Sequence, residues 1–226
     1  MTAITLPLVT ALVAGFVHAL EADHMAAVTT FVSRRPHPLR ALSFGVRWGV
    51  GHSVAILALG GGLLLLDLRI PEGIESVLEG GVGALLLGLG LWVLGSTLHE
   101  QRYSHAHARA HSGGHTHSHL HPSGQGTLWV GVAHGLAGTA ALLALLPAAL
   151  LSSGWLAAGY LLSFGVGTVV AMGLYALLAG LVFHHAGSRV PAVGMGLRLI
   201  TGLGSSVLGV LWISSALGDV FFVVAS

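Results

Sequence analysis

Six long apolar stretches alternate with shorter, more polar connections along the chain. Each stretch reaches the roughly 20 mostly apolar residues that an α-helix needs to cross the hydrocarbon core of a membrane. Prolines fall in four of the five connections, where a missing backbone N–H is easily tolerated. The pattern predicts an all-α polytopic membrane protein with six transmembrane helices, at residues 4–32, 41–66, 76–98, 127–150, 155–183 and 193–217.

The composition agrees with a protein whose outer solvent is lipid. Charged residues make up 8% of the 226 residues, and the mean hydropathy is +0.86, whereas a soluble domain carries about 25% charged residues. The chain has no Cys, which excludes disulfides, thiolate metal sites and thiol redox chemistry. It also has no basic stripe, so we expect the protein to contact membrane lipid and not to bind nucleic acid.

The arginines predict how the helices are oriented. The first, third and fifth connections hold six of the nine arginines, whereas the second and fourth hold only Arg69. Basic residues accumulate on the cytoplasmic side of membrane proteins. We therefore expect an integral protein of the plasma (inner) membrane of a prokaryote, with both termini outside and the connection 99–126 in the cytoplasm.

The two halves of the chain resemble each other at one fixed offset. "HALEADH" begins at His18 and "HGLAGTA" at His134, while "GVGHSV" begins at Gly49 and "GVGTVV" at Gly165, in both cases 116 residues later. With three spans in each half, the halves would run in opposite directions, as in the inverted repeats of secondary transporters. The expected organisation is a first three-helix repeat at 1–98, a loop at 99–126 and a second three-helix repeat at 127–226.

Ionisable side chains in the first span are the main chemical signal. His18, Glu21, Asp23 and His24 lie within an otherwise apolar stretch, where unpaired ionisable groups are costly and usually functional. Imidazole and carboxylate together suit divalent transition metals. On a regular helix Asp23 and His24 point away from His18, so one ion collects all three only if the helix unwinds locally. Broken helices are tolerated where they line a cavity. The alternative is a polar network that joins this helix to its neighbours.

Other polar residues of the spans are candidates of second rank. His52, in "WGVGHSV" of the second span, is expected to join the ligands, because the preceding glycines permit close approach of the backbone. His134 matches His18 through the repeat. Glu21, Ser53 and Thr168 are pathway candidates, although helix packing is the favoured use for the two hydroxyls.

The connection at 99–126 is rich in histidine. Eight of the fifteen histidines lie between positions 99 and 121, in a Gly/Ser-rich context typical of metal-binding segments without a packed core. We expect a disordered cytoplasmic loop that holds divalent metals loosely, or a proton-buffering linker. A cytoplasmic metallochaperone is a candidate partner there. The candidate auxiliary ligands are His105, His107, His111, His115, His117, His119 and His121.

These motifs resemble a known family. "HALEADHMAAV" resembles the H-x4-D-H signature of the nickel/cobalt transporter (NiCoT) family, and "GHSV" resembles its second motif. "VGVAHGLAGTAALLAL" and the His-rich loop look like its shorter six-span branch, often labelled urease accessory nickel permeases. The resemblance implies nickel or cobalt permeation, with His18, Asp23 and His24 in metal recognition and His52 assisting.

The chain departs from that family at several positions. Glu21 stands where the first motif usually has Asp, and Val17 stands where Arg is common. "LSFGVGTVVAMGLYALLAG" carries no acid, whereas longer members have acidic motifs in their later spans. Acidic ligands of the second half are therefore not carried over.

The leading interpretation is a secondary transporter, or permease, for divalent transition-metal ions, with Ni²⁺ first and Co²⁺ second. The ion is cargo, and no permanently bound cofactor and no enzymatic activity are expected; a G-x4-GK[ST] motif is absent. Export, or transport of Zn²⁺ or Fe²⁺, fits the same residues. From other classes, a metal sensor or an intramembrane metalloenzyme remains an alternative, although the H-E-x-x-H motif is absent.

Overall fold

The computed structural model describes residues 2–34, 37–66, 74–107, 124–137, 147–151, 153–189 and 191–225. Every regular element among them is an α-helix. The first half holds α1 (Thr2–His18), α2 (Ala22–Ser33), α3 (Pro38–Leu66) and α4 (Ile74–His107). The second half holds α5 (Gly124–Ala137), α7 (Gly154–Arg189) and α8 (Pro191–Ala225).

Four helices are long and apolar enough to cross a membrane, namely α3, α4, α7 and α8. The bent pair α1 and α2 makes a fifth crossing if it counts as one broken span. The stretch expected at 127–150 coincides with α5 at its start, but residues 138–146 lie outside the described residues. The described part of the chain thus supports a helical membrane protein with four or five crossings.

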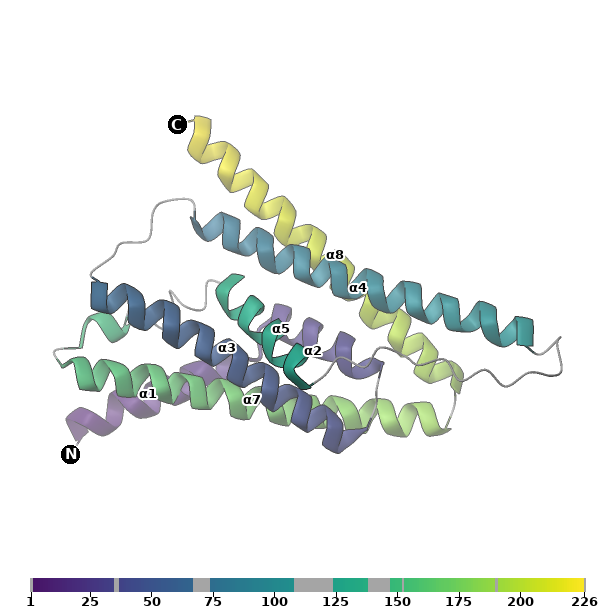
Figure 1. The fold of residues 1–226 in the computed structure, drawn as a ribbon, viewed down its shortest axis with the longest axis horizontal. Coiled ribbons are helices and arrows are strands. Elements are labelled where there is room, and N and C mark those ends of the chain that lie inside the picture. The colour runs from purple at the N-terminus through teal and green to yellow at the C-terminus, as the bar shows by residue number, and fades with distance from the viewer. Residues whose placement is uncertain are drawn as a thin grey trace.

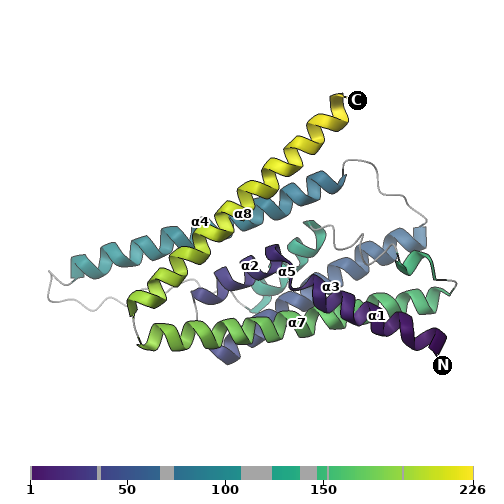
Figure 2. The ribbon, with the colours of Figure 1, turned by 180° about the vertical axis from the view of Figure 1, so that it is seen from behind.

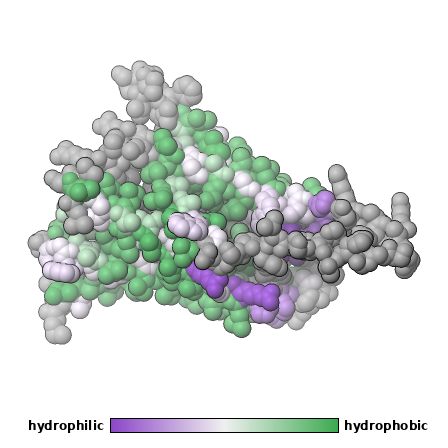
Figure 3. Space-filling view, in the orientation of Figure 1, coloured by the Kyte–Doolittle hydropathy of each residue, from purple (hydrophilic) through white to green (hydrophobic). Residues whose placement is uncertain are grey.

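The surface has the character that lipid requires. Large apolar side chains are exposed along most helices, among them Leu6, Trp129, Trp155 and Ile200. Figure 3 shows apolar residues over most of the visible face, with hydrophilic residues gathered toward the right of the view. Several polar side chains are instead buried among the helices. Apolar residues outside and polar residues at the centre are the distribution expected of a protein that encloses an ion site in a membrane.

The most extensive helix contacts are those of α4 with α8, of α3 with α7, of α3 with α5 and of α1 with α7. Both termini lie at the left of Figure 1, whereas α2, α4 and α7 finish at the right, where α3 and α8 begin. Figure 2 shows the same pairing from behind, with α1 lying along α7. Arg34 directly follows α2 and Arg198 lies near the start of α8, the helix ends that the sequence predicts to be cytoplasmic.

Glycines let the paired helices touch through their backbones. A Cβ atom at Gly15 of α1 would collide with the carbonyl oxygen of Phe164 of α7, and one at Gly131 of α5 would collide with that of Trp48 of α3. The 116-residue offset that relates His18 to His134 also relates Gly15 to Gly131 and Trp48 to Phe164. The two contacts are therefore equivalent under the repeat.

A second pair of contacts is related in the same way. A Cβ atom at Gly51 would collide with the carbonyl oxygen of Leu128, and one at Gly167 with that of Leu12. In Figure 1, α3 and its offset counterpart α7 run in opposite directions, as do α4 and α8. The helix contacts therefore follow the offset that is visible in the sequence.

The expected loop at 99–126 begins later along the chain than position 99. α4 continues to His107, so that His105 and His107 fall in its last turns. The other candidate loop ligands, His111, His115, His117, His119 and His121, lie outside the described residues.

The backbone contact between α3 and α5 gives a first testable prediction. Gly51→Ala places a methyl group against the Leu128 carbonyl and forces the helices apart, which we expect to cost about 1–3 kcal/mol of stability, as overpacking does. The control is Gly62→Ala in the same helix, where no atom lies within 4 Å of the added Cβ. There the better helix propensity of Ala is expected to stabilise by about 0.5–1 kcal/mol.

Thermal unfolding in detergent, followed by circular dichroism, measures both variants. Equal melting temperatures for Gly51→Ala and Gly62→Ala would contradict the close contact.

Candidate metal centre

A break in the first span creates the centre of the site. α1 ends at His18 and α2 begins at Ala22, with an angle of 56° between them. The connecting residues form a tight turn, in which the N–H of Leu20 donates to the carbonyl of Val17 and that of Glu21 to the carbonyl of His18, both at 3.0 Å. Glu21 is extended, with φ −67° and ψ 155°. The chain thus unwinds locally, as the sequence argument requires if His18, Asp23 and His24 are to meet.

The break brings four imidazoles and one carboxylate together. His18 comes from the end of α1, Asp23 and His24 from the first turn of α2, His52 from α3 and His134 from α5. All five residues are at least nine-tenths buried. The ring centroid of His24 lies 4.5 Å from that of His18, 4.9 Å from that of His52 and 4.4 Å from that of His134. His24 is therefore the centre of the cluster.

Two overlapping sets of atoms have the spacing of metal ligands. One nitrogen each from His18, His24 and His52 lie within 4.8 Å of one another, as do ligand atoms of Asp23, His24 and His134. A metal–imidazole bond of about 2.1 Å places opposite ligands about 4.2 Å apart. Small side-chain movements would therefore suffice to close either set around an ion.

The hydrogen bonds distinguish the two sets. The Asp23 carboxylate contacts Nδ1 of His24 through Oδ1 at 2.9 Å and Nε2 of His134 through Oδ2 at 3.2 Å. A carboxylate that accepts from one ring nitrogen fixes the tautomer and leaves the other nitrogen with its lone pair available. For His24 that other nitrogen is Nε2, which is buried and has no hydrogen-bond partner.

Most of the unsatisfied ring nitrogens belong to the first set, although Nδ1 of His134 in the second set is also buried without a hydrogen-bond partner. Both ring nitrogens of His18 and of His52 are buried without a hydrogen-bond partner, like Nε2 of His24. Nδ1 of His18 lies 3.1 Å from Oε2 of Glu21, whose side chain is 48% exposed. Buried polar groups are ordinarily paired, and each unpaired one needs an explanation. A cation bound by one nitrogen from each of these three imidazoles, with Asp23 balancing charge from behind His24, would account for three of these nitrogens.

The remaining candidates have other partners. The hydroxyl of Ser53 donates to the carbonyl of Gly165 at 3.1 Å. That of Thr168 donates to the carbonyls of Gly15 and Phe164, both at 3.1 Å. These contacts join α3 and α1 to α7, so both residues serve helix packing in this structure.

Aromatic side chains that the sequence argument did not single out enclose the cluster. Phe164 stacks on His18 with centroids 5.7 Å apart, and Trp48 lies edge-on to His134 at 5.8 Å. Trp48 precedes His52 by four residues, a spacing that places both on one face of α3. The sequence argument also gave Glu79 no role. Together with Glu21 and Asp23, it lines a cavity of about 590 Å³ beside the helix break.

Comparison with known proteins identifies related chains. The chain is similar to the urease accessory protein UreH of Bacillus sp. (strain TB-90), with 30% identity over 198 residues, which cover 88% of this chain and 86% of UreH. It is also similar to two proteins of Arabidopsis thaliana, named chloroplast protein FOR GROWTH AND FERTILITY 2 and 1, with 30% and 29% identity over 83% and 88% of this chain. It spans about half the length of these two, 54% and 56%.

No protein-family model matches the chain, and no solved structure matches it. The similarity to UreH, however, covers 88% of this chain and 86% of UreH. The chain belongs to the family of the urease accessory protein UreH.

Proposed function

We propose that the protein is a secondary transporter of divalent transition-metal ions, with Ni²⁺ as its principal cargo and His18, His24 and His52 as the ligands. The observation that carries the proposal is the cluster of buried, unpaired imidazole nitrogens at a break in a membrane-spanning segment. Discontinuous helices with an ion site near the middle of the membrane are typical of secondary transporters.

The donor types support a transition metal. Imidazole nitrogens suit nickel, copper, zinc and iron, whereas Mg²⁺ and Ca²⁺ prefer sites made of oxygen atoms. Nickel is favoured within this group because the motifs resemble those of nickel permeases, and because a relative over most of the chain is named a urease accessory protein.

Asp23 has a supporting role in the proposal. Its carboxylate touches both His24 and His134, so it orients one ligand and connects the first half of the chain to the second. Its negative charge offsets part of the charge of the ion in a site that water does not surround. His134 completes the second set of ligand atoms and gives the ion a neighbouring position on the far side of His24.

The inverted-repeat organisation belongs to the proposal as well. The reciprocal contacts of α1 with α7 and of α3 with α5 support two halves related by a pseudo-two-fold axis. The cluster draws residues from both halves, since His18 and His134 are offset counterparts. Relative movement of the halves would then change the surroundings of the bound ion.

Flux measurements test the transport function. Proteoliposomes containing the full chain are expected to take up ⁶³Ni²⁺ saturably, and His24→Ala or His52→Ala should lower the flux at fixed Ni²⁺ at least tenfold, because each removes a ligand. Losing only a group that orients a ligand already costs about 10–100-fold in affinity. The control is His185→Ala, which removes an exposed imidazole near the end of α7.

Unlabelled Co²⁺, Zn²⁺ and Fe²⁺ as competitors rank the cargo ions. Absence of saturable flux for all four metals, with folded protein in both orientations, would contradict the transporter. Saturable binding without flux would instead identify a sensor.

Equilibrium binding tests the role of Asp23. In a background in which the seven histidines from His105 to His121 are replaced by Gln, Asp23→Asn keeps the shape of the side chain but removes its charge and presents an N–H₂ group to one of two imidazoles. We expect Ni²⁺ affinity to fall about 10–100-fold, with unchanged helix content.

The Co²⁺ absorption spectrum of the same variant separates a ligand from an orienting group. It should keep its wild-type shape in Asp23→Asn and change in His52→Ala. An Asp23→Asn variant with wild-type affinity would show that the carboxylate contributes nothing to the site.

A further inference from the structure

The two ends of α2 are in different environments. Its first turn borders the cavity of about 590 Å³, whose walls come from the break and α2 (Glu21, Ala22, Asp23), from α4 (Glu79, Val82) and from α8 (Leu211, Trp212, Ser215). Asp23 belongs both to this wall and to the histidine cluster, and its side chain is 12% exposed. The cavity therefore reaches the cluster from one side.

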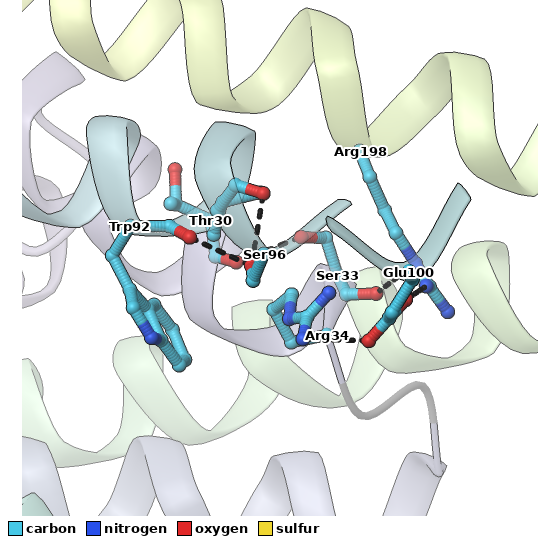
Figure 4. A network of polar contacts seen from close by, with 8 residues as sticks. Thr30, Ser33, Arg34, Trp92, Ser96, Glu100 and Arg198 are labelled. Atoms are coloured by element: carbon cyan, nitrogen blue, oxygen red, sulfur yellow. Dashed lines mark hydrogen bonds and ion pairs between the residues drawn. The ribbon is translucent and has the colours of Figure 1, made fainter. Parts of the chain in front are cut away.

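The last turn of α2 is closed against the same two helices. Nη2 of Arg34 lies 2.8 Å from Oε1 of Glu100 on α4, and Nη1 of Arg198 on α8 lies 3.4 Å from Oε2 of the same carboxylate. Nε of Arg198 also donates to the carbonyl of Ser33 at 3.0 Å. Figure 4 shows how Glu100 lies between the two guanidinium groups, with Arg34 close to Trp92.

Aromatic side chains reinforce the closed end. Phe31 of α2 stacks on Phe44 of α3 with centroids 4.4 Å apart and lies 5.6 Å from Trp92 of α4. Thr30 and Ser33 are completely buried. The described residues thus show tight packing between the cluster and the Glu100 end of α4.

On α4, Glu79 lines the cavity and Glu100 contacts Arg34 at the end of α2. At about 1.5 Å per helical residue they are about 30 Å apart, which is the thickness of the hydrocarbon core. The cavity and the closed end therefore lie near opposite faces of the membrane.

The repeat relates these two places to each other. Under the offset of 116 residues, Val82 of the cavity wall corresponds to Arg198 of the closed end. In the same way, Ser96 of the closed end corresponds to Trp212 of the cavity wall. The same place on the α4–α8 pair is thus hollow at one membrane face and filled by an ion-pair cluster at the other.

We propose that the cavity is the ion's access path from one side of the membrane, and that Glu100, held by Arg34 and Arg198, is the closed gate on the other side. This inference rests on the proposed function. In the opposite state the roles exchange: the Glu100 contacts separate and the cavity beside Glu79 closes. The carboxylates of Glu21 and Glu79 make the open path attractive to cations.

Thiol accessibility tests the path without using metal or flux, because the chain has no native Cys. Single variants Ser215→Cys in the cavity wall and Ser96→Cys at the closed end are treated in proteoliposomes with a membrane-impermeant cationic methanethiosulfonate. The matched control is Ser214→Cys, next to Ser215 but on another face of α8, where the native hydroxyl is exposed and bonds its own helix.

We expect Ser215→Cys to react at least tenfold faster than Ser96→Cys and Ser214→Cys, because only a thiol in a wet path ionises readily. Adding Glu100→Gln should release the gate, raise the rate at Ser96→Cys several-fold and lower that at Ser215→Cys. Equal rates at Ser215→Cys and Ser214→Cys would overturn the path, and rates unaffected by Glu100→Gln would overturn the gate.

The charge of the path is tested with a pair of reagents. The ratio of rates for the cationic and the anionic methanethiosulfonate at Ser215→Cys should exceed one and fall several-fold in Glu79→Gln. An unchanged ratio would overturn the role of Glu79. The expected labelling without any Ni²⁺ flux would support the path and contradict the proposed cargo, whereas intact flux without this labelling would overturn the path alone.

Discussion

The contact of the Asp23 carboxylate with the rings of His24 and His134 is the interaction on which the rest of the structure depends. It lies at the break between α1 and α2, and it joins a residue of the first half to one of the second. A carboxylate at this depth would be costly if unpaired. The surrounding fold brings His52 and His134 to the cluster by letting α3 and α5 approach through Gly51, Gly131 and Gly135, which touch the opposite backbone or lie close to it.

The same close packing leaves imidazole nitrogens without partners. A buried polar group without a hydrogen bond costs about 1–3 kcal/mol, and the cluster contains several such atoms on His18, His24 and His52. A bound cation would satisfy one nitrogen of each of these three rings. If the cluster binds the proposed ion, the site exchanges stability of the ion-free protein for affinity, which is the arrangement expected where a membrane protein must replace the hydration shell of its cargo. The exposed ion pairs at Glu100 are, by contrast, worth about 0.2–1 kcal/mol each, which suits contacts that must open and close.

The sequence was sufficient for the helical class and for the composition of the cluster, because both follow from local chemistry. Acids and histidines in an apolar stretch need compensation, and the angular spacing of His18, Asp23 and His24 required a broken helix if one ion was to contact all three. The 116-residue offset also anticipated which helix pairs make equivalent contacts. Tertiary arrangement was not accessible in this way. Nothing local to "GIESVLEGG" shows that Glu79 lines a cavity with Trp212, and nothing near Glu100 shows that Arg34 and Arg198 meet on it. Those contacts join segments far apart in the chain, so only the packed structure reveals them.

The central claim is that three imidazoles, from His18, His24 and His52, hold the ion at the helix break. X-ray absorption spectroscopy of the Ni²⁺-loaded protein tests it most directly, with the histidines from His105 to His121 replaced by Gln so that only the buried site contributes. The account predicts the multiple-scattering signal of three imidazoles, reduced to two by His52→Ala and kept at three by Asp23→Asn. A spectrum with one imidazole or none, or one that His52→Ala leaves unchanged, would contradict it.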